Sequence, residues 1–405
     1  MAEEKRIILE YADQINPENA GEYIKVGGYK GLEKARAMSR KDVIEEVKKS
    51  GLRGRGGAGF PAGLKWSFVP EAPVKYVVCN LDEGEPGTYK DRIICQKNAQ
   101  AVLEGMAICG TAIDSTKGYI YCRGEYPYVV DLLNKAIDSA KEAGVLGDFD
   151  IEVRMGAGAY VCGEETALIE SIEGNRGEPR FKPPFPGVEG LWGVPTIVNN
   201  VETFAALPYI LSNGGEWFAG IGAPKYPGTK ILTLTGDVNN ATYFEVPTDY
   251  NLRDVIYTLG GGIKNGKKFK AVQVGGTSGA FIPEQNLNTP IDFDSMSAIG
   301  AALGSGAVLV LDETRDIVDV VTRIAKFFEH ESCGKCNPCR EGTFRALELM
   351  EIINDGLGNA GDLDTLKILG RVMQNASFCG LGQAAPIPIQ STLQHFEHEY
   401  KRKFL

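Results

Sequence analysis

Histidine is nearly absent from this sequence of 405 residues. It occurs at His330, His395 and His398, so the first 329 residues contain none. Histidine is the general base in Ser-His-Asp and Cys-His hydrolases. The sequence therefore excludes hydrolases of this kind from that region. Chemistry placed there must work without histidine as a base or a metal ligand.

An excess of positive charge is lacking as well. Lys and Arg total 43 and Asp and Glu total 53, which gives a formal net charge of −10. Nucleic-acid binding through phosphates requires a surplus of basic groups, so we expect no nucleic-acid partner. The hydrophobic share of 43% is that of an ordinary folded chain, which excludes disorder as the main state.

Long apolar runs are missing too. The longest uncharged stretch, residues 295–311, contains Gly and Ser and falls short of the ~20 residues that a spanning helix needs. We interpret it as a loop that leads into a buried strand. The opening segment MAEEKRIILEYADQ has no apolar core like that of a signal peptide, and its acidic residues argue against a transit peptide. We therefore expect a bacterial-type cytoplasmic protein without direct membrane insertion.

Strands and helices alternate over the first half of the chain, after a helical opening in which Ser39 and Asp42 form a capping-box pattern. Predicted strands lie at 74–79, 119–123 and 151–155, and predicted helices lie at 99–112, 129–143, 164–172 and from about 200. Such alternation is typical of a parallel sheet covered by helices. The expected fold class of residues 1–223 is therefore α/β.

The pattern changes beyond residue 223. A hairpin (231–235 and 243–246), a short helix (252–259) and a strand (269–274) predict a small α+β domain over residues 224–312. Residues 313–405 are predicted to be helical, with four helices at 317–330, 344–355, 363–375 and 387–400. Four helices of this length favour a small bundle.

Three of the nine cysteines lie close together. Cys333, Cys336 and Cys339 have the spacing C-x2-C-x2-C, and Cys379 follows in the segment SFCGLG. Three thiolates in seven residues can surround one face of an iron–sulfur cubane, and a distant Cys can ligate the fourth iron. Because position 343 is Thr rather than a further Cys, a single [4Fe–4S] cluster is predicted.

Zinc is the main alternative for these cysteines. Structural zinc usually takes two separated pairs of ligands, which leaves the third closely spaced thiol without a role. Core cysteines are the second alternative, although the flanking Gly, Lys, Asn and Pro are unusual for a core. The remaining cysteines lie in apolar segments and are predicted to be buried free thiols: Cys79, Cys95, Cys109, Cys122 and Cys162.

Glycine is abundant, with 50 residues, and it concentrates in two loops. Six glycines in residues 51–63 would let backbone N–H groups approach a phosphate, with Arg53, Arg55 and Lys65 adding positive charge. A second loop from Gly156 to Gly163 opens a predicted helix but does not have the GxGxxG pattern of dinucleotide-binding proteins. Either loop could equally be an ordinary turn.

An acidic loop follows the first predicted strand. Asn80, Asp82, Glu83 and Glu85 stand where a parallel strand ends, which is a common place for ligand-binding side chains. Their charge would repel phosphate and suits ribose hydroxyls or ring N–H groups. The pair Glu164 and Glu165 presents the same case, and a solvated acidic turn is the alternative in both.

Together these motifs resemble the NADH-binding flavoprotein subunit of respiratory NADH:quinone oxidoreductase and the related modules of NAD-linked hydrogenases, formate dehydrogenases and aldehyde oxidoreductases. The blocks that carry the resemblance are residues 51–68, 80–92, 156–180, 182–203 and 331–342, with Cys379. The resemblance implies an FMN-binding α/β domain, a β-grasp-like domain and a four-helix bundle that carries the cluster.

The resemblance also implies site residues. FMN, or FAD in its place, would be held by Gly54, Arg55, Gly56, Lys65, Asn80, Asp82, Glu83, Tyr160, Gly163, Glu164, Asn199, Asn200 and Thr203. NADH would stack its adenine among Phe60, Phe68 and Phe185, with Glu85, Glu165 and Lys182 along the rest of its path. Each Phe could instead be an ordinary core residue.

The implied reaction is hydride transfer between NADH and the flavin, followed by single-electron transfer to the cluster. Stacking and orientation suffice for hydride transfer, so no catalytic protein acid or base is expected and the scarcity of histidine fits. Glu165 would repel a 2′-phosphate, which predicts NAD rather than NADP as the coenzyme.

A cluster with no further relay in this chain implies partner subunits. We expect other iron–sulfur subunits, such as a thioredoxin-like [2Fe–2S] subunit, or a hydrogenase, formate, aldehyde or quinone-reducing module. The protein would then be cytoplasmic or peripheral on the cytoplasmic face of a membrane complex. The chain shows no thioredoxin-like segment or C-terminal ferredoxin cysteines, and it has Glu85 where electron-bifurcating relatives often have Asp. These differences favour a non-bifurcating module, and an electron-bifurcating variant of the same module is the alternative.

Two other functions compete with this one. The first is a non-catalytic electron-transfer or assembly subunit with a degenerate flavin site. The second is a zinc-stabilised nucleotide sensor. The intact glycine and acidic blocks argue against the first, and the cysteine spacing argues against the second.

Overall fold

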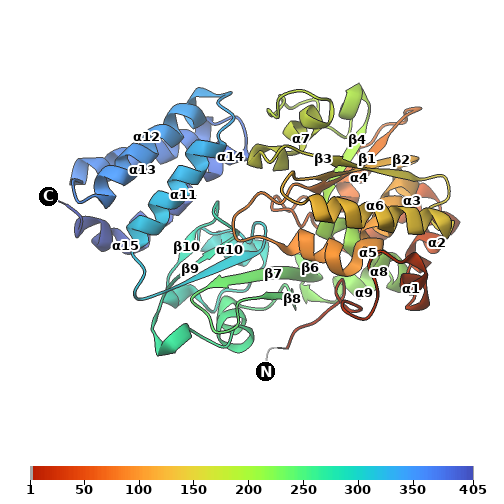
Figure 1. Cartoon of the computed structure of the whole chain (residues 1–405), viewed down its shortest axis with the longest axis horizontal. Coiled ribbons are helices and arrows are strands. Elements are labelled where there is room, and N and C mark those ends of the chain that lie inside the picture. The colour runs from red at the N-terminus through yellow and green to blue at the C-terminus, as the bar shows by residue number, and fades with distance from the viewer. Residues whose placement is uncertain (1–2, 405) are drawn as a thin grey trace.

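The computed structural model describes residues 3–404, and a four-stranded parallel sheet lies at the centre of its first part (Figure 1). The strands are β1 (Tyr76–Leu81), β2 (Lys117–Cys122), β3 (Asp150–Met155) and β4 (Thr196–Asn200), in the order β3-β2-β1-β4. The chain runs from β1 through β2 to β3, and β4 is then added on the other side of β1. The strand order therefore reverses between β1 and β4, which is where open α/β sheets bind ligands.

Both faces of this sheet are buried, as expected of parallel strands. The long helices α5 (Lys90–Ile113), α6 (Pro127–Glu142) and α8 (Val201–Asn213) cover one face. The 3₁₀ turn η1 (Tyr160–Gly163), helix α7 (Glu165–Ile172) and the 3₁₀ turn η2 (Leu191–Gly193) contribute to the core on the other face. The predicted α/β fold is confirmed. The five cysteines expected to be buried free thiols are buried and unpaired.

Short helices precede the sheet: α1 (Ala20–Lys25), α2 (Lys30–Ala37), α3 (Arg40–Lys49) and α4 (Ala62–Ser67). The predicted cap of α3 is confirmed, because Ser39 Oγ accepts the Asp42 N–H at 3.2 Å. The carboxylate of Glu104 on α5 fixes α2 by accepting the N–H groups of Tyr29 at 2.8 Å and Leu32 at 3.0 Å.

A second, five-stranded sheet follows the short segments α9 (Gly215–Ala219), β5 (Gly222–Ala223) and β6 (Tyr226–Pro227). Its strands are β7 (Thr229–Gly236), β8 (Tyr243–Pro247), β9 (Phe269–Val274), β10 (Phe281–Ile282) and β11 (Ala307–Asp312). The order is β10-β9-β11-β7-β8, and only β7 and β11 are paired in parallel among these strands. The shorter segments are η3 (Asp254–Leu259), η4 (Lys264–Gly266), η5 (Glu284–Asn286) and α10 (Phe293–Ala298).

The stretch at residues 295–311 was expected to be a loop that leads into a strand, and this is correct for its second half alone. Its first residues belong to α10, and β11 follows at Ala307. The signal for α10 lies outside the uncharged stretch, because Asp292 caps the helix by accepting the Ser295 N–H at 2.9 Å.

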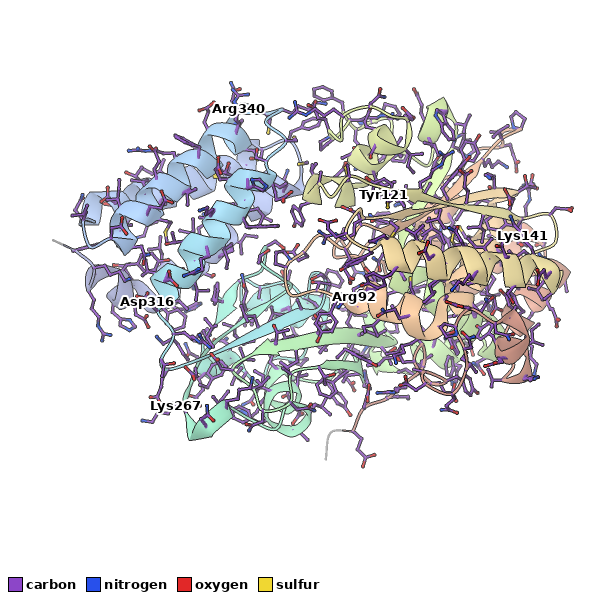
Figure 2. All side chains as sticks on the ribbon, in the orientation of Figure 1. Arg92, Tyr121, Lys141, Lys267, Asp316 and Arg340 are labelled. Atoms are coloured by element: carbon purple, nitrogen blue, oxygen red, sulfur yellow. The ribbon has the colours of Figure 1, made fainter. Side chains whose placement is uncertain are left out.

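The C-terminal part is helical, as predicted. It contains α11 (Ile317–Glu331), α12 (Asn337–Asn354), α13 (Ala360–Ala376), the short α14 (Gly380–Ala384) and α15 (Ile387–Lys401). Helix α11 packs on α12 and α15, and α13 packs on the same two helices. Helix α12 begins earlier than predicted, because Pro338 at its first turn is compatible with a helix start. Figure 2 shows Arg340 and Asp316 at opposite ends of this helical unit.

A buried ionic network joins the two sheets. Glu202 on α8 contacts Lys230 on β7 and lies 3.1 Å from Nζ of Lys90, while its Oε1 accepts the Ile231 N–H at 2.8 Å. All three charged side chains are buried. Burial acts to raise the pKa of Glu202, but Lys230 and Lys90 together lower it below its ordinary value. The network therefore holds an ionised carboxylate at the junction.

None of the helices within residues 3–404 is both long enough and apolar enough to span a membrane.

We predict that Glu202→Gln lowers the free energy of unfolding by ~3–5 kcal/mol at pH 7, because the buried Lys230 loses its carboxylate partner and Lys90 keeps only Asp91. A carboxyl group with a lowered pKa stabilises the fold above its ordinary pKa and loses this effect in acid, so the difference from wild type should shrink below about pH 4. Urea unfolding at pH 7 and below about pH 4 measures the loss of stability and its decrease in acid, with the exposed Glu216→Gln on α9 as control. A loss below about 1 kcal/mol at pH 7 contradicts the account.

Candidate functional site

Polar side chains gather where β1 and β4 end. Asn80 Nδ2 donates to the carbonyl of Gly163 at 2.8 Å, which joins β1 to the turn η1. On β4, Asn199 Oδ1 accepts from Nε1 of Trp66 at 3.4 Å, and Asn200 Nδ2 donates to Asp91 at 2.8 Å. The resemblance placed these asparagines among the flavin ligands. The fold brings all three to the point where the strand order reverses.

The first glycine loop passes directly over the end of β4. A Cβ atom on Gly56 would lie 3.1 Å from Cβ of Asn200, so a side chain there would press on the asparagine. Gly57 has a φ of +134°, which favours glycine. The Gly54 N–H donates to the Phe60 carbonyl at 2.9 Å and closes the loop. The loop is therefore a structured element against β4, and together with the polar side chains at the ends of β1 and β4 it forms a cradle.

Asp82 has an oxygen that lacks a partner. Its Oδ2 atom is fully buried and has no hydrogen-bond donor among the described residues. A Cβ atom on Gly163 would come within 3.7 Å of this oxygen, so glycine leaves that side of the carboxylate open. Burial raises the pKa of Asp82 to about 7, against the opposing effect of Arg123. A buried acceptor of this kind fits a ligand that offers a hydroxyl, such as the ribityl chain of a flavin.

Two of the expected flavin ligands use their side chains elsewhere. Glu83 accepts the backbone N–H groups of Asp91 at 2.7 Å and Arg92 at 3.1 Å, so it stabilises the start of α5. Burial raises the pKa of Glu83 to about 8, with Asp91 adding to the shift. The Arg55 guanidinium is 1% exposed and donates to the Pro227 carbonyl at 2.5 Å. The side chain of Glu83 faces α5 and that of Arg55 faces β6, rather than the ends of β1 and β4.

The backbone of Arg55 is held separately, since its N–H donates to Oγ1 of Thr203 at 2.9 Å. The guanidinium also lies over the ring of Tyr226 at 4.2 Å from the ring centroid. Thr203 thus fixes the glycine loop from the first turn of α8. The positive charge of Arg55, which was expected at the flavin, therefore lies against β6.

An ion-pair cluster lies beside the cradle. Lys65 Nζ lies 2.7 Å from Glu165, and Lys182 Nζ lies 2.7 Å from Glu164 and 3.1 Å from Glu165. Burial acts to raise the pKa of Glu165, but the two lysines together lower it below its ordinary value. Glu164 also caps α7 by accepting the Ala167 N–H at 3.0 Å. Glu165 is therefore an ionised carboxylate shared between two cations.

The three phenylalanines expected to stack on adenine are exposed. Phe60, Phe68 and Phe185 are 48%, 58% and 58% exposed, so the alternative that they are core residues is wrong. Phe60 and Phe68 flank α4, which carries Lys65. Exposed aromatic rings beside a charged cluster are typical of a binding surface.

Glu85 and Tyr160 are hydrogen-bonded to each other. The Tyr160 hydroxyl donates to Oε2 of Glu85 at 2.6 Å, and its ring packs edge-on against Phe327 of α11 with centroids 5.1 Å apart. The Tyr160 N–H donates to Glu331 at 3.0 Å. The turn η1 therefore contacts the acidic loop and the C-terminal helices together.

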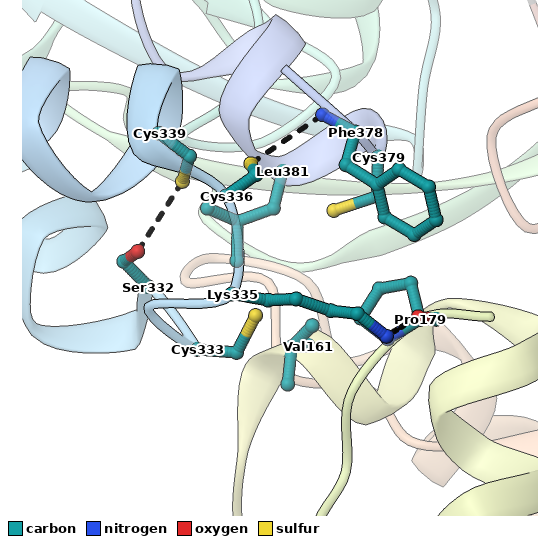
Figure 3. Close-up of a pocket in the computed structure, with 10 residues that line it drawn as sticks. All are labelled: Val161, Pro179, Ser332, Cys333, Lys335, Cys336, Cys339, Phe378, Cys379 and Leu381. Carbon is teal, nitrogen blue, oxygen red and sulfur yellow. Dashed lines mark hydrogen bonds between the residues drawn. The ribbon is translucent and has the colours of Figure 1, made fainter. Parts of the chain in front are cut away.

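The four patterned cysteines line one pocket (Figure 3). Cys333 and Cys336 approach it from the α11–α12 connection, Cys339 approaches it from the first turn of α12, and Cys379 approaches it from the loop before α14. The Phe378 N–H donates to the sulfur of Cys336 at 3.5 Å, and Ser332 Oγ lies 3.3 Å from that of Cys339. The remaining lining residues are Val161, Pro179, Lys335 and Leu381.

The four cysteines favour a cluster over a single metal ion. Within residues 3–404, no three Cys, His, Asp or Glu side chains converge tightly enough to hold a single metal ion. Four thiols, three of them closely spaced in sequence, match the ligand set of a [4Fe–4S] cluster better than the two separated pairs of a zinc site. Burial raises the pKa of Cys339 to about 11, so ligation must overcome a preference for the protonated thiol.

One four-residue turn is shared by the two candidate sites. Gly163 of η1 accepts from Asn80 in the cradle, and Val161 of the same turn lines the cysteine pocket. The turn is buried between the parallel sheet and the C-terminal helices. The cradle and the cysteine pocket therefore both contact this short segment.

Sequence reasoning missed several residues that support the site. Trp66 holds Asn199, Lys90 donates to Asn200 Oδ1 at 3.1 Å, and Glu331 holds Tyr160. Thr277 and Ser278 contact Glu85 from the second sheet. The neighbouring Gly275 and Gly276 were the sequence signal from which a turn at Thr277 and Ser278 could have been predicted. The other three carried none, because their partners are distant in sequence.

We predict that Asp82→Asn stabilises the cofactor-free protein at pH 8 by ~1–3 kcal/mol, because it removes a buried unpaired charge. A carboxyl group whose pKa is raised to about 7 destabilises the fold progressively as pH rises from its ordinary pKa through 7. The gain should therefore shrink toward pH 4. Urea unfolding at several pH values measures it, with the exposed Asp138→Asn on α6 as control. A variant less stable than wild type at pH 8 contradicts this interpretation of Asp82.

Comparison with known families assigns these regions. Residues 47–209 match the Nuo51 FMN-binding domain, and residues 319–403 match the NADH-ubiquinone oxidoreductase-F iron-sulfur binding region. Residues 231–281 match the SLBB domain. The predicted FMN and [4Fe–4S] cofactors and NADH as substrate are thereby confirmed.

Similar proteins cover nearly the whole chain. The HndC subunit of the NADP-reducing hydrogenase of Solidesulfovibrio fructosivorans is 48% identical over 98% of this chain and 83% of its own length. The F subunit of the NADH-quinone oxidoreductase of Aquifex aeolicus is 45% identical over 98% of this chain and 94% of its own. An NAD⁺-reducing [NiFe]-hydrogenase structure in the H₂-reduced state aligns over 100% of this chain and 68% of that chain, with a TM-score of 0.89 and 35% identity. The chain therefore belongs to the family of NADH-binding flavoprotein subunits of NADH-quinone oxidoreductase and related hydrogenases.

Proposed function

We propose that the chain binds FMN where the strand order reverses between β1 and β4 and oxidises NADH there. A cluster in the cysteine pocket would be the next electron acceptor. The observation that carries this assignment is the turn η1, which contributes Gly163 to the cradle and Val161 to the cysteine pocket. When bound, the flavin accepts hydride from the nicotinamide and releases single electrons, and the [4Fe–4S] cluster carries them one at a time. The residues of the chain bind and orient these groups.

The cradle residues divide by what they offer a flavin. Asp82 Oδ2 offers an unpaired acceptor to a ribityl hydroxyl, and Lys65 offers a cation. Asn80, Asn199 and Asn200 are fixed by their partners, so their amides are pre-oriented. The other proposed contacts come from the segments around them: Gly54, Arg55, Gly56, Glu83, Tyr160, Gly163, Glu164 and Thr203. We assign Arg55 through its backbone, and Glu83 as a support of the loop.

The nucleotide is proposed to lie over the exposed rings. Phe60, Phe68 and Phe185 would stack with adenine, which offers a flat apolar surface to side chains otherwise left in water. Lys182 and Glu165 would line the rest of its path, where the cation is balanced by two carboxylates. Glu85 would accept from ribose hydroxyls. Cys333, Cys336, Cys339 and Cys379 would ligate the cluster.

Three domains organise these sites in the proposal. Residues 1–223 form the flavin and nucleotide domain, residues 224–312 a β-grasp-like domain, and residues 313–405 a four-helix bundle. The parallel β7–β11 pair inside a five-stranded sheet supports the β-grasp assignment. The mutual packing of α11, α12, α13 and α15 supports the bundle.

The partners are proposed to be iron–sulfur subunits of a larger redox complex. One similar protein is named a subunit of a hydrogenase and others are named subunits of NADH-quinone oxidoreductase. A thioredoxin-like [2Fe–2S] subunit, or a hydrogenase, formate, aldehyde or quinone-reducing module, would take up the electrons. We propose a cytoplasmic location.

An absorbance experiment tests the function. Protein purified anaerobically should show flavin and cluster absorbance, contain about four iron atoms per chain, and reduce ferricyanide on addition of NADH while the flavin bleaches. Cys379→Ser should lose cluster absorbance and still bleach with NADH, whereas Cys109→Ala, in buried α5, should keep both. A brown protein without flavin supports a non-catalytic electron-transfer role. A colourless zinc protein supports a nucleotide sensor.

Coenzyme choice is a separate prediction. We expect wild type to use NADH in preference to NADPH, because the Glu165 carboxylate opposes a 2′-phosphate even with Lys65 and Lys182 beside it. Glu165→Gln should shift the ratio of kcat/KM values toward NADPH by about tenfold, which corresponds to ~1.4 kcal/mol.

Steady-state kinetics with both coenzymes measures this ratio, and the exposed Glu189→Gln in the adjacent loop is the control. Comparable kcat/KM for the two coenzymes in wild type, or an unchanged ratio in Glu165→Gln, contradicts the assignment.

A further inference from the structure

The turn between β9 and β10 of the second sheet reaches the acidic loop of the proposed nucleotide site. Thr277 Oγ1 and the Ser278 N–H each donate to Oε1 of Glu85 at 2.8 Å. The Tyr160 hydroxyl donates to Oε2 at 2.6 Å. Glu85 therefore has three donors on two oxygens, two of them supplied by the second sheet. A carboxylate has about four acceptor positions, so one is left for a ligand.

The turn is shaped around this carboxylate. Gly276 has a φ of +93°, and a Cβ atom there would lie 2.2 Å from Cγ of Glu85. Any other residue at this position would displace the glutamate. The buried Gln273 braces the turn from inside, since its Nε2 donates to the carbonyls of Thr277 at 3.1 Å and Gly279 at 3.0 Å. Thr277 is thus presented by a rigid element.

Further contacts fix the loop beyond Glu85. Thr233 Oγ1 on β7 donates to the Gly87 carbonyl at 2.7 Å, and the hydroxyls of Thr88 and Ser305 lie 2.6 Å apart. Ser305 Oγ also donates to the Gly275 carbonyl at 3.1 Å. The second sheet therefore holds the acidic loop from Glu85 to Thr88. These contacts restrict where the carboxylate can move.

We propose that Thr277 is a positioning residue of the nucleotide site, which holds the Glu85 carboxylate in the orientation that accepts hydroxyl groups of NADH. The inference rests on the proposed function, and it assigns the second sheet a part in substrate binding. Loss of the Thr277 hydroxyl leaves Oε1 of Glu85 with the Ser278 N–H as its one remaining donor from this turn, so the orientation of the carboxylate is less restricted. Nucleotide binding should weaken, whereas the transfer step, which depends on the flavin, should not change.

Steady-state NADH:ferricyanide kinetics of the holoprotein tests this, together with the Kd for NAD⁺ from fluorescence titration. Thr277→Val should raise KM and Kd about three- to tenfold with kcat, flavin content and iron content unchanged. Thr277→Ser, which keeps the donor, should restore wild-type values. Thr277→Ala lacks the donor without adding bulk and serves if the Val variant folds poorly. The exposed Thr365→Val on α13 is the control.

The outcomes separate the two claims. Wild-type KM and Kd in both donor-free variants overturn the positioning role while the proposed function stands. A fall in kcat or cofactor content that also occurs in Thr277→Ser overturns the positioning role as well. That variant keeps the hydroxyl donor, so such an effect would be structural. Wild-type protein that carries flavin and neither binds nor oxidises NADH overturns the proposed function, and this inference with it.

Discussion

The turn η1 is the constraint on which the rest of the site depends. Its four residues contact the parallel sheet through Gly163, the acidic loop through Tyr160 and the cysteine pocket through Val161. A single short segment thereby holds the two candidate sites next to each other. Because the turn is buried between the sheet and the C-terminal helices, it cannot move without disturbing both sites.

Ionisable groups are placed in the interior at a cost in stability. Asp82 has a buried oxygen without a donor, and burial raises the pKa values of Glu83 and Glu104 as well. For Glu83 and Glu104, hydrogen bonds from backbone N–H groups offset part of the cost of burial. The same hydrogen bonds fix the start of α5 and of α2. Asp82 Oδ2 has no such compensation among the described residues. An uncompensated group beside a glycine is what a ligand site requires, whereas a purely structural carboxylate would be expected to have partners.

The fold could be predicted where periodicity and capping are local. Runs of β-branched apolar residues predicted the parallel strands, and the capping pattern of Ser39 and Asp42 predicted the start of α3. The sequence did not predict α14, because a helix of five residues is too short to show a hydrophobic period. The predicted range of α12 was too short, because the first turn of this helix is polar. Motif spacing found the cysteines and the acidic loop. It could not show that the side chain of Glu83 turns toward α5 and that of Arg55 toward β6, because those partners are set by packing between segments distant in sequence. The role of Thr277 was hidden for the same reason.

FMN and NADH are proposed to bind where the strand order reverses between β1 and β4, and η1 joins this place to the cysteine pocket. A crystal structure of the protein reconstituted with FMN and soaked anaerobically with NADH tests it directly. We predict a ribityl hydroxyl within hydrogen-bonding distance of Asp82 Oδ2, adenine among Phe60, Phe68 and Phe185, and an iron–sulfur cluster on the four cysteines. A flavin bound elsewhere, with Asp82 Oδ2 still unpaired, would contradict the account.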